Sequence, residues 1–122
     1  MSSTSYKELE VWNKAKDLAV QIYKLTNQGE FAKDYSLKDQ IRRSAVSIPS
    51  NIAEGNDRES EKEYARFLYI AKGSLSELQT QLVISKEIGY IDEETFKVVD
   101  SECNSIGKML GKFIKTLCKS RE

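Results

Sequence analysis

Histidine is absent from the 122-residue chain, and proline occurs only once. Without histidine the chain lacks the commonest general base and the commonest metal ligand, and the Glu-x-x-His pairs of di-iron bundles cannot form. The sequence also has no phosphate-binding glycine loop and no nucleophile elbow. We therefore expect a protein that is not an enzyme, takes no small-molecule substrate and needs no cofactor or metal.

Cysteine is scarce, with Cys103 and Cys118 as the only thiols. Fifteen positions of one predicted helix separate them by about 22 Å, whereas the Cα atoms of a disulfide lie within about 7 Å. An intrachain disulfide is therefore excluded, and two distant thiols cannot make a zinc site. The simplest role for both is that of small hydrophobes; an intermolecular disulfide or a redox role is the alternative.

Neither sign of charge predominates, because Lys plus Arg and Asp plus Glu both number 19. No net field then draws the whole molecule to a polyanion or an anionic membrane, so charged recognition must come from local segregation. The apolar runs are only a few residues long, far short of the roughly 20 that cross a bilayer, and the polar N-terminus lacks a signal-peptide core. We expect a cytoplasmic protein that makes no membrane contact.

Four helix starts can be read from capping patterns. Ser5, Ser36 and Ser60 are each followed three positions later by an acidic residue, as in a capping box. Asp92 precedes two glutamates, which favour the positive end of a helix dipole. Gly29, Gly55 and Gly89 follow periodic apolar segments, as C-terminal caps do. The helices are predicted at about 6–27, 37–55, 60–88 and 92–119.

Apolar residues within these segments alternate at spacings of four and three, which is typical of a bundle seam. The predicted seams are Val11, Ala15, Leu18, Ile22 and Leu25; Tyr64, Leu68, Ala71, Leu75, Leu78 and Leu82; and Phe96, Val99, Cys103, Ile106, Leu110, Phe113 and Leu117. The connections are short enough to make neighbouring helices antiparallel. We therefore predict an all-α, up-down-up-down four-helix bundle with residues 1–122 as a single domain.

A second apolar line on the first helix includes Trp12 and Tyr23. A wide apolar face is normal for a helix that touches two neighbours. The alternative is a second surface that is buried against another subunit.

The segment QIRRSAVSIPSNIAEG of the second helix departs from ordinary bundle sequence. Pro49 removes a backbone donor and should kink the helix, at a cost of roughly 3 kcal/mol. A polar line of Arg43, Ser47, Asn51 and Glu54 runs opposite the apolar residues. These side chains either face water and bond to nearby backbone, or are buried against another helix or subunit, where they fix orientation.

Small residues on the third helix could receive a partner at close range. Gly73 and Ser74 form a small-residue patch, with Glu77 one turn further on. Such a patch lets another backbone approach closely. Arg43 would then pair with Glu54 or with Glu77.

The last helix carries a basic line formed by Lys108, Lys112, Lys115 and Lys119, with Arg121 beyond it. The line either complements the negative end of the helix dipole or contacts phosphates, with weak contacts adding up in an oligomer. A second basic candidate surrounds the turn between helices two and three: Arg42, Arg43, Arg58, Lys62 and Arg66. Glu59, Glu61 and Glu63 dilute this charge and are typical of a solvated ion-pair surface.

Three blocks, VWNKAKDLAVQIYKLT, QIRRSAVSIPSNIAEGNDR and EYARFLYIAKGSLSELQTQL, carry a family resemblance. They resemble the four-helix bundle proteins encoded in intervening sequences of bacterial 23S ribosomal RNA. That family is distantly similar to the accessory protein of diversity-generating retroelements, which binds a reverse transcriptase and nucleic acid. The resemblance implies a ring-like homopentamer whose cellular role is undefined.

Two functional hypotheses follow. In the first, a homo-oligomer assembles through its wide apolar faces and a set of interface residues, and scaffolds a protein or ribonucleoprotein partner. The expected interface residues are Arg43, Ser47, Pro49, Asn51, Glu54, Gly73, Ser74, Glu77, Trp12 and Tyr23. In the second, the assembly binds RNA or DNA through its basic residues.

Overall fold

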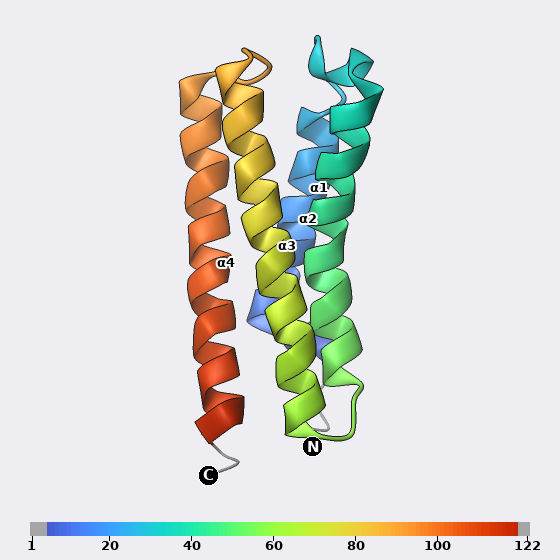
Figure 1. Ribbon diagram of the computed structural model, residues 1–122, viewed down its shortest axis with the longest axis vertical. Coiled ribbons are helices and arrows are strands. Elements are labelled where there is room, and N and C mark those ends of the chain that lie inside the picture. The colour runs from blue at the N-terminus through green and yellow to red at the C-terminus, as the bar shows by residue number, and fades with distance from the viewer. Residues whose placement is uncertain (1–4, 120–122) are drawn as a thin grey trace.

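The computed structural model describes residues 5–119, and Figure 1 shows its four long helices packed lengthwise. In chain order the elements are the 3-10 turn η1 (Tyr6–Glu8), α1 (Glu10–Leu25), the 3-10 turn η2 (Phe31–Lys33), α2 (Tyr35–Asn56), α3 (Glu61–Glu87) and α4 (Glu93–Lys119). Consecutive helices run in opposite directions, so α1 begins and α4 ends at the same end of the bundle (Figure 1). The predicted all-α bundle is confirmed, and residues 5–119 contain no strand.

The predicted starts of α3 and α4 are confirmed to within a residue. The Ser60 hydroxyl accepts a hydrogen bond from the Glu63 amide at 3.1 Å, and Asp92 accepts one from the Thr95 amide at 2.7 Å. The bonds from Thr95 lower the pKa of the Asp92 carboxyl. Both helices therefore begin with an amide satisfied by a side chain, as the capping pattern indicates.

The predicted start of the first helix is wrong. Ser5 accepts from the Lys7 amide at 3.2 Å and caps only the short turn η1, while α1 begins at Glu10. Asn13 bridges the break, because its side-chain amide donates to the Lys7 carbonyl at 2.9 Å and to the Leu9 carbonyl at 3.0 Å. The bond to Lys7 satisfies a carbonyl that a continuous helix would have paired internally, whereas the Leu9 carbonyl also accepts from the Asn13 backbone amide at 3.1 Å.

The second helix begins two residues before the predicted position, because Asp34 and not Ser36 is its cap. One carboxylate oxygen of Asp34 accepts from the Leu37 amide at 3.1 Å, and the other accepts from the Tyr90 hydroxyl at 2.9 Å. Both bonds favour the charged form and lower the pKa of Asp34. Tyr90 also packs on buried Phe31, with ring centroids 5.2 Å apart. The connection before α2 is thereby tied to the connection before α4.

One of the three predicted glycine caps is confirmed. Gly89, with a φ of +84°, directly follows Ile88, the last capping residue of α3, and adopts the left-handed region that ends a helix. Gly29 also has a positive φ, +53°, but α1 is capped by Thr26, three residues earlier, so the predicted cap at Gly29 is wrong. Gly55 lies inside α2 with an ordinary helical φ, so its predicted role as a cap is wrong. A Cβ added at Gly55 would lie 2.9 Å from the Cβ of Phe67 and 3.2 Å from the carbonyl oxygen of Tyr64. Glycine is required there by the close approach of α3.

The core follows the predicted seams with one change of register. Every predicted seam residue of α3 is buried, as are Val11, Ala15, Leu18 and Ile22 of α1. On α4 the buried seam is Val99, Cys103, Ile106, Leu110, Ile114 and Leu117, while Phe96 and Phe113 are half-buried at its edge. Ile114 thus takes the place predicted for Phe113, whose ring packs edge-on against Tyr64 at 5.0 Å.

Candidate interaction surfaces

The centre of the α2 polar line joins α2 to α3 within one chain. The Ser47 and Ser74 hydroxyls lie 2.8 Å apart and share a hydrogen bond. The Asn51 side-chain amide donates to the Ser47 carbonyl at 2.8 Å and to its hydroxyl at 2.9 Å. The Ser47–Ser74 bond crosses between the two helices, as the second interpretation of the polar line expected. Both bonds of Asn51 stay within α2, and the one to the Ser47 carbonyl fits the first interpretation.

The ends of the polar line behave differently, and the expected pairing of Arg43 with Glu54 or Glu77 is not formed. Arg43 lies on the solvent side of α2, where it pairs with Asp39 at 3.5 Å, one turn back on the same helix. Glu77 instead accepts from the Ser44 hydroxyl at 3.0 Å, across the α2–α3 boundary. The first interpretation, a water-facing line with local partners, therefore holds for these ends.

Pro49 is buried and does not end its helix. α2 runs through it from Tyr35 to Asn56. Because its side chain is buried within the chain, Pro49 offers no surface to a partner in solution.

The solvent side of α3 carries an apolar line. Ile70 and Ile84 of α3 and Ile88, just after the helix, are 40%, 45% and 52% exposed, and Glu77 lies seven residues from both Ile70 and Ile84. Gly73 lies on the same line, and a Cβ added there would meet nothing within 4 Å. The small-residue patch predicted at Gly73 is therefore open to the outside.

A recess of about 340 Å³ lies between α2 and α3 beside this line, bordered by Gln40, Arg43, Ser44, Ser47, Glu77 and Gln81. Gln81 is only 7% exposed, and within the described residues its side-chain oxygen Oε1 has no hydrogen-bond partner. Sequence reasoning missed Gln81, because it is polar and lies outside the predicted apolar seam of α3. Its place between Leu78 and Leu82 could have indicated that it points inward. We call the recess and the apolar line together the α2–α3 face.

Trp12 and Tyr23 of the second α1 line lie on the side of the bundle where α1 meets α2. Trp12 is half-buried, with its ring edge-on to Tyr6 at 5.1 Å. Tyr23 is 44% exposed and lies under the guanidinium of Arg42 at 4.3 Å. Arg42 also donates to the Thr26 hydroxyl at 2.8 Å and to the Tyr23 carbonyl at 3.2 Å. Arg42 therefore ties the end of α1 to α2.

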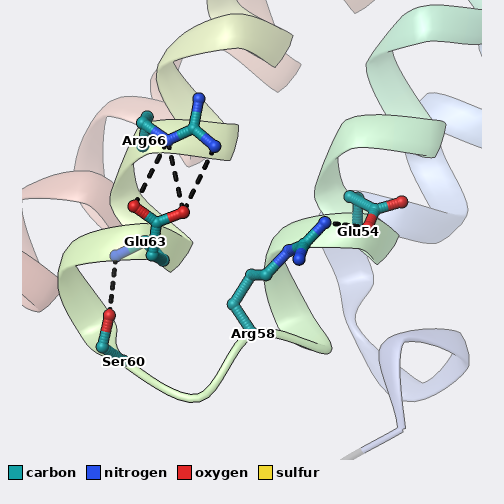
Figure 2. A network of polar contacts seen from close by, with 5 residues as sticks. All are labelled: Glu54, Arg58, Ser60, Glu63 and Arg66. Atoms are coloured by element: carbon teal, nitrogen blue, oxygen red, sulfur yellow. Dashed lines mark hydrogen bonds and ion pairs between the residues drawn. The ribbon is translucent and has the colours of Figure 1, made fainter.

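The predicted basic cluster at the α2–α3 turn is not assembled as expected. Figure 2 shows Arg58 directed at Glu54 and Arg66 at Glu63, so carboxylates of the same turn offset both guanidinium groups. The two guanidinium groups also lie over the ring of Phe67, at 4.7 and 4.6 Å. Arg42 lies roughly 21 Å from the C-terminal end of α2, counted along the helix axis, and takes no part in the cluster.

The four lysines predicted on α4 form a ridge of exposed side chains: Lys108, Lys112, Lys115 and Lys119, here called the lysine ridge. Within residues 5–119 none of them lies within 4.0 Å of a carboxylate. Arg121, predicted to extend the line, lies outside the described residues. Lys62, from the other predicted cluster, is exposed at the start of α3.

An open groove of about 730 Å³ borders the lysine ridge where α4 meets α3. Tyr69 and Lys72 of α3 line it together with Met109, Gly111, Ile114 and Cys118 of α4. Sequence reasoning missed Tyr69 and Lys72 because their neighbours depend on the register between two helices. Two contacts set that register. The rings of Tyr64 and Phe113 pack together, and the Gln79 side-chain amide donates to the Asn104 side-chain oxygen at 2.9 Å.

The two cysteines differ in environment. Cys103 is fully buried in the α4 seam, and burial raises the pKa of its thiol to about 12, so it stays protonated and inert. Cys118 is half-buried at the edge of the groove. No group of three or more His, Cys, Asp or Glu residues in the described part of the chain is arranged to hold a metal ion.

None of the helices between residues 5 and 119 has the length and apolar character of a bilayer-crossing segment. The model of the 23S rRNA-intervening sequence protein family matches residues 7–112. A solved structure from Bacteroides thetaiotaomicron VPI-5482, a protein of unknown function from the S23 ribosomal protein family, is 29% identical. It superposes with a TM-score of 0.80 over 86% of this chain and 98% of its own. No curated protein matches the chain. The chain belongs to the 23S rRNA-intervening sequence protein family.

Proposed function

We propose that the protein is a non-enzymatic homo-oligomer that scaffolds a protein or ribonucleoprotein partner, and that copies meet through the α2–α3 face. The observation that carries the proposal is the buried Oε1 of Gln81, which lacks a donor within the described chain. Leaving a buried carbonyl unpaired costs about 1–3 kcal/mol. A donor from a second copy that entered the recess would remove that cost.

The surroundings of Gln81 suit another helix. Three exposed isoleucines and the open position at Gly73 give α3 a second apolar line, opposite the one that faces its own core. A helix that is apolar on two sides is typical of a bundle that packs against further subunits. The family resemblance supports a pentameric ring, because the related bundles assemble in that way.

Light scattering tests assembly directly. We expect a mass several times 13.9 kDa, and five times that value for a pentamer. Ile84→Glu places a charge on the apolar line and should reduce the mass to that of smaller species, because burying an unpaired charge is costly. Val98→Glu is the matched control, since Val98 is 53% exposed on α4, away from this face. An unaltered protein that stays monomeric at tens of micromolar would refute the proposal.

A second candidate function is contact with RNA or DNA phosphates through the lysine ridge of the assembly. The observation that favours it is the absence of carboxylate partners for these lysines within residues 5–119, whereas Arg43, Arg58 and Arg66 each have one. Phosphate contacts make affinity fall steeply with salt, by about 0.9 in the log–log slope for each duplex contact. This function would be excluded if the protein bound none of RNA, single-stranded DNA and duplex DNA at low salt.

A further inference from the structure

Tyr69 differs from the other five tyrosines of the chain. Each of those five has a ring or a cation against it: Tyr6 packs on Trp12, Tyr23 under Arg42, Tyr35 near Lys38, Tyr64 on Phe113 and Tyr90 on Phe31. Tyr69 is 58% exposed and has no such partner within residues 5–119. A flat aromatic surface is therefore presented to the solvent at the α3–α4 groove.

The groove beside Tyr69 combines an apolar floor with a basic rim. Buried Ile114 and half-buried Cys118 line it, and Gly111 leaves open space where a side chain would otherwise stand. Lys72 comes from α3, and three lysines of the ridge, Lys108, Lys112 and Lys115, come from α4. A ligand that fits such a groove must carry both an apolar, stackable part and negative charge.

The charge around the groove is segregated along the sequence as well. Between Glu102 and Glu122 the chain contains no acidic residue, although it carries four lysines and an arginine. The lysines from Lys108 to Lys119 extend over roughly 16 Å of helix. That length suits several phosphates in a row better than the single phosphate of a mononucleotide.

We propose that the α3–α4 groove binds single-stranded nucleic acid, with an unpaired base stacked on Tyr69 and the phosphates along Lys72 and the lysine ridge. The inference rests on the second candidate function and adds the class of ligand and its position. Sites for single strands combine a basic groove with exposed aromatic rings, because every unpaired base offers a flat face. In a duplex the bases are already stacked and cannot reach Tyr69.

Fluorescence anisotropy with a labelled oligouridine of twelve nucleotides tests the stacking step. A base–aromatic stack contributes about 1–3 kcal/mol, so Tyr69→Ala should weaken binding by about 5- to 150-fold. Tyr69→Phe keeps the ring and should bind within about twofold of the unaltered protein. Tyr35→Ala is the matched control, because Tyr35 is 75% exposed at the start of α2 and does not line the groove.

The lysines are tested by the salt dependence of the same binding. Lys112→Gln should lower the slope of log affinity against log salt by about 0.7, the value for one phosphate contact on a single strand. Lys97→Gln, on the acidic half of α4, should leave the slope unchanged. Equal slopes for all three proteins would overturn the placement of phosphates on the ridge.

Cys118 provides a footprint of the occupied groove without any substitution. Iodoacetamide should modify Cys118, while buried Cys103 with its raised pKa serves as the unreactive reference. Saturating oligouridine should slow the modification of Cys118, as followed by mass spectrometry of its peptide. An unchanged rate in a protein that binds the oligomer would overturn the proposed position.

The outcomes separate this inference from the function on which it rests. If the protein bound single strands and duplex with equal affinity, and Tyr69→Ala did not change either affinity, the groove site would be overturned but phosphate binding would stand. The groove site would also be overturned if uridine monophosphate bound as tightly as the oligomer. The same holds if Tyr69→Ala weakened binding to anionic lipid vesicles but not to nucleic acid. No binding of any nucleic acid at low salt would end both proposals.

Discussion

The α2–α3 pair and the C-terminal helix α4 are held in the bundle by different means. Between α2 and α3, small and polar residues are used one by one: Gly55 admits the backbone of α3, and Ser47 shares a hydrogen bond with Ser74. α4 is attached mainly by a regular apolar seam, and a Cβ added at Gly107 would lie 3.3 Å from a Leu75 methyl group. The first interface depends on individual residues and the second on a repeating pattern.

This difference separates the surface properties of the two regions. Because α4 packs mainly through its seam and the residues at the edge of the seam, its outer side is free to carry the lysine ridge. On α3 the inner side packs against α2 and α4, yet the outer side keeps exposed isoleucines. α3 therefore has apolar side chains that a single chain leaves exposed. α4 has lysines that lack carboxylate partners within residues 5–119.

The largest expected effect tests the seam of α4. Leu110 is fully buried, so Leu110→Ala should lower the free energy of unfolding by about 2–5 kcal/mol. Leu110→Met keeps the volume and should cost less than about 1.5 kcal/mol. Urea denaturation followed by circular dichroism measures both. If the methionine variant were as unstable as the alanine variant, the seam would require a specific shape and the comparison would fail.

The next effect tests the close contact of α2 with α3. Gly55→Ala forces a Cβ to within 2.9 Å of Phe67, and we expect a loss of about 1–3 kcal/mol through overpacking, even though alanine favours a helix. Gly73→Ala meets nothing within 4 Å in the single chain and should raise the stability of an isolated chain by up to about 1 kcal/mol.

The same glycine pair sharpens the assembly proposal. If a partner helix approaches Gly73 in the oligomer, Gly73→Ala should reduce the mass seen by light scattering while the monomer remains well folded. Gly55→Ala should instead lower stability at every protein concentration. If the Gly55→Ala variant melted at the same temperature as the unaltered protein, α3 would be able to move away from α2 with little loss of stability.

Much of the fold could be predicted from sequence because it depends on local patterns. Every seam residue predicted on α3 is buried, although the seam left out buried Ala65, Gln81 and Ser85. Capping chemistry placed the starts of α3 and α4. Phe113 was assigned to the seam in place of Ile114 because both fit a spacing of three or four, and only the bulk of Tyr64 opposite decides between them.

The features that could not be predicted depend on alignment between helices. The cap at Asp34 is reinforced by Tyr90, which lies 56 positions later. Arg42 was grouped with basic residues nearby in sequence, yet its partners Tyr23 and Thr26 belong to α1. For the same reason, no single-helix pattern could bring Tyr69 to the lysine ridge or leave Gln81 without a donor.

The smallest effect tests a buried hydrogen bond between α2 and α3. The Tyr64 hydroxyl donates to Asn56 Oδ1 at 2.9 Å, and Tyr64→Phe should cost about 1 kcal/mol at neutral pH. Burial raises the pKa of Tyr64 to about 12, so the folded state holds this proton more tightly than the unfolded state, whose tyrosine titrates near 10.

The contribution of the raised pKa is complete below pH 10 and is lost as the pH rises towards 12, because the unfolded chain then releases the proton first. The phenylalanine variant lacks this loss. The stability gap between the two proteins should therefore narrow over that interval in paired urea titrations, while Tyr35→Phe, at an exposed site, should show no such change. A gap that stays constant from pH 7 to 12 would mean that the Tyr64 hydroxyl reaches water, and that the α2–α3 contact is looser than the position of Gly55 requires.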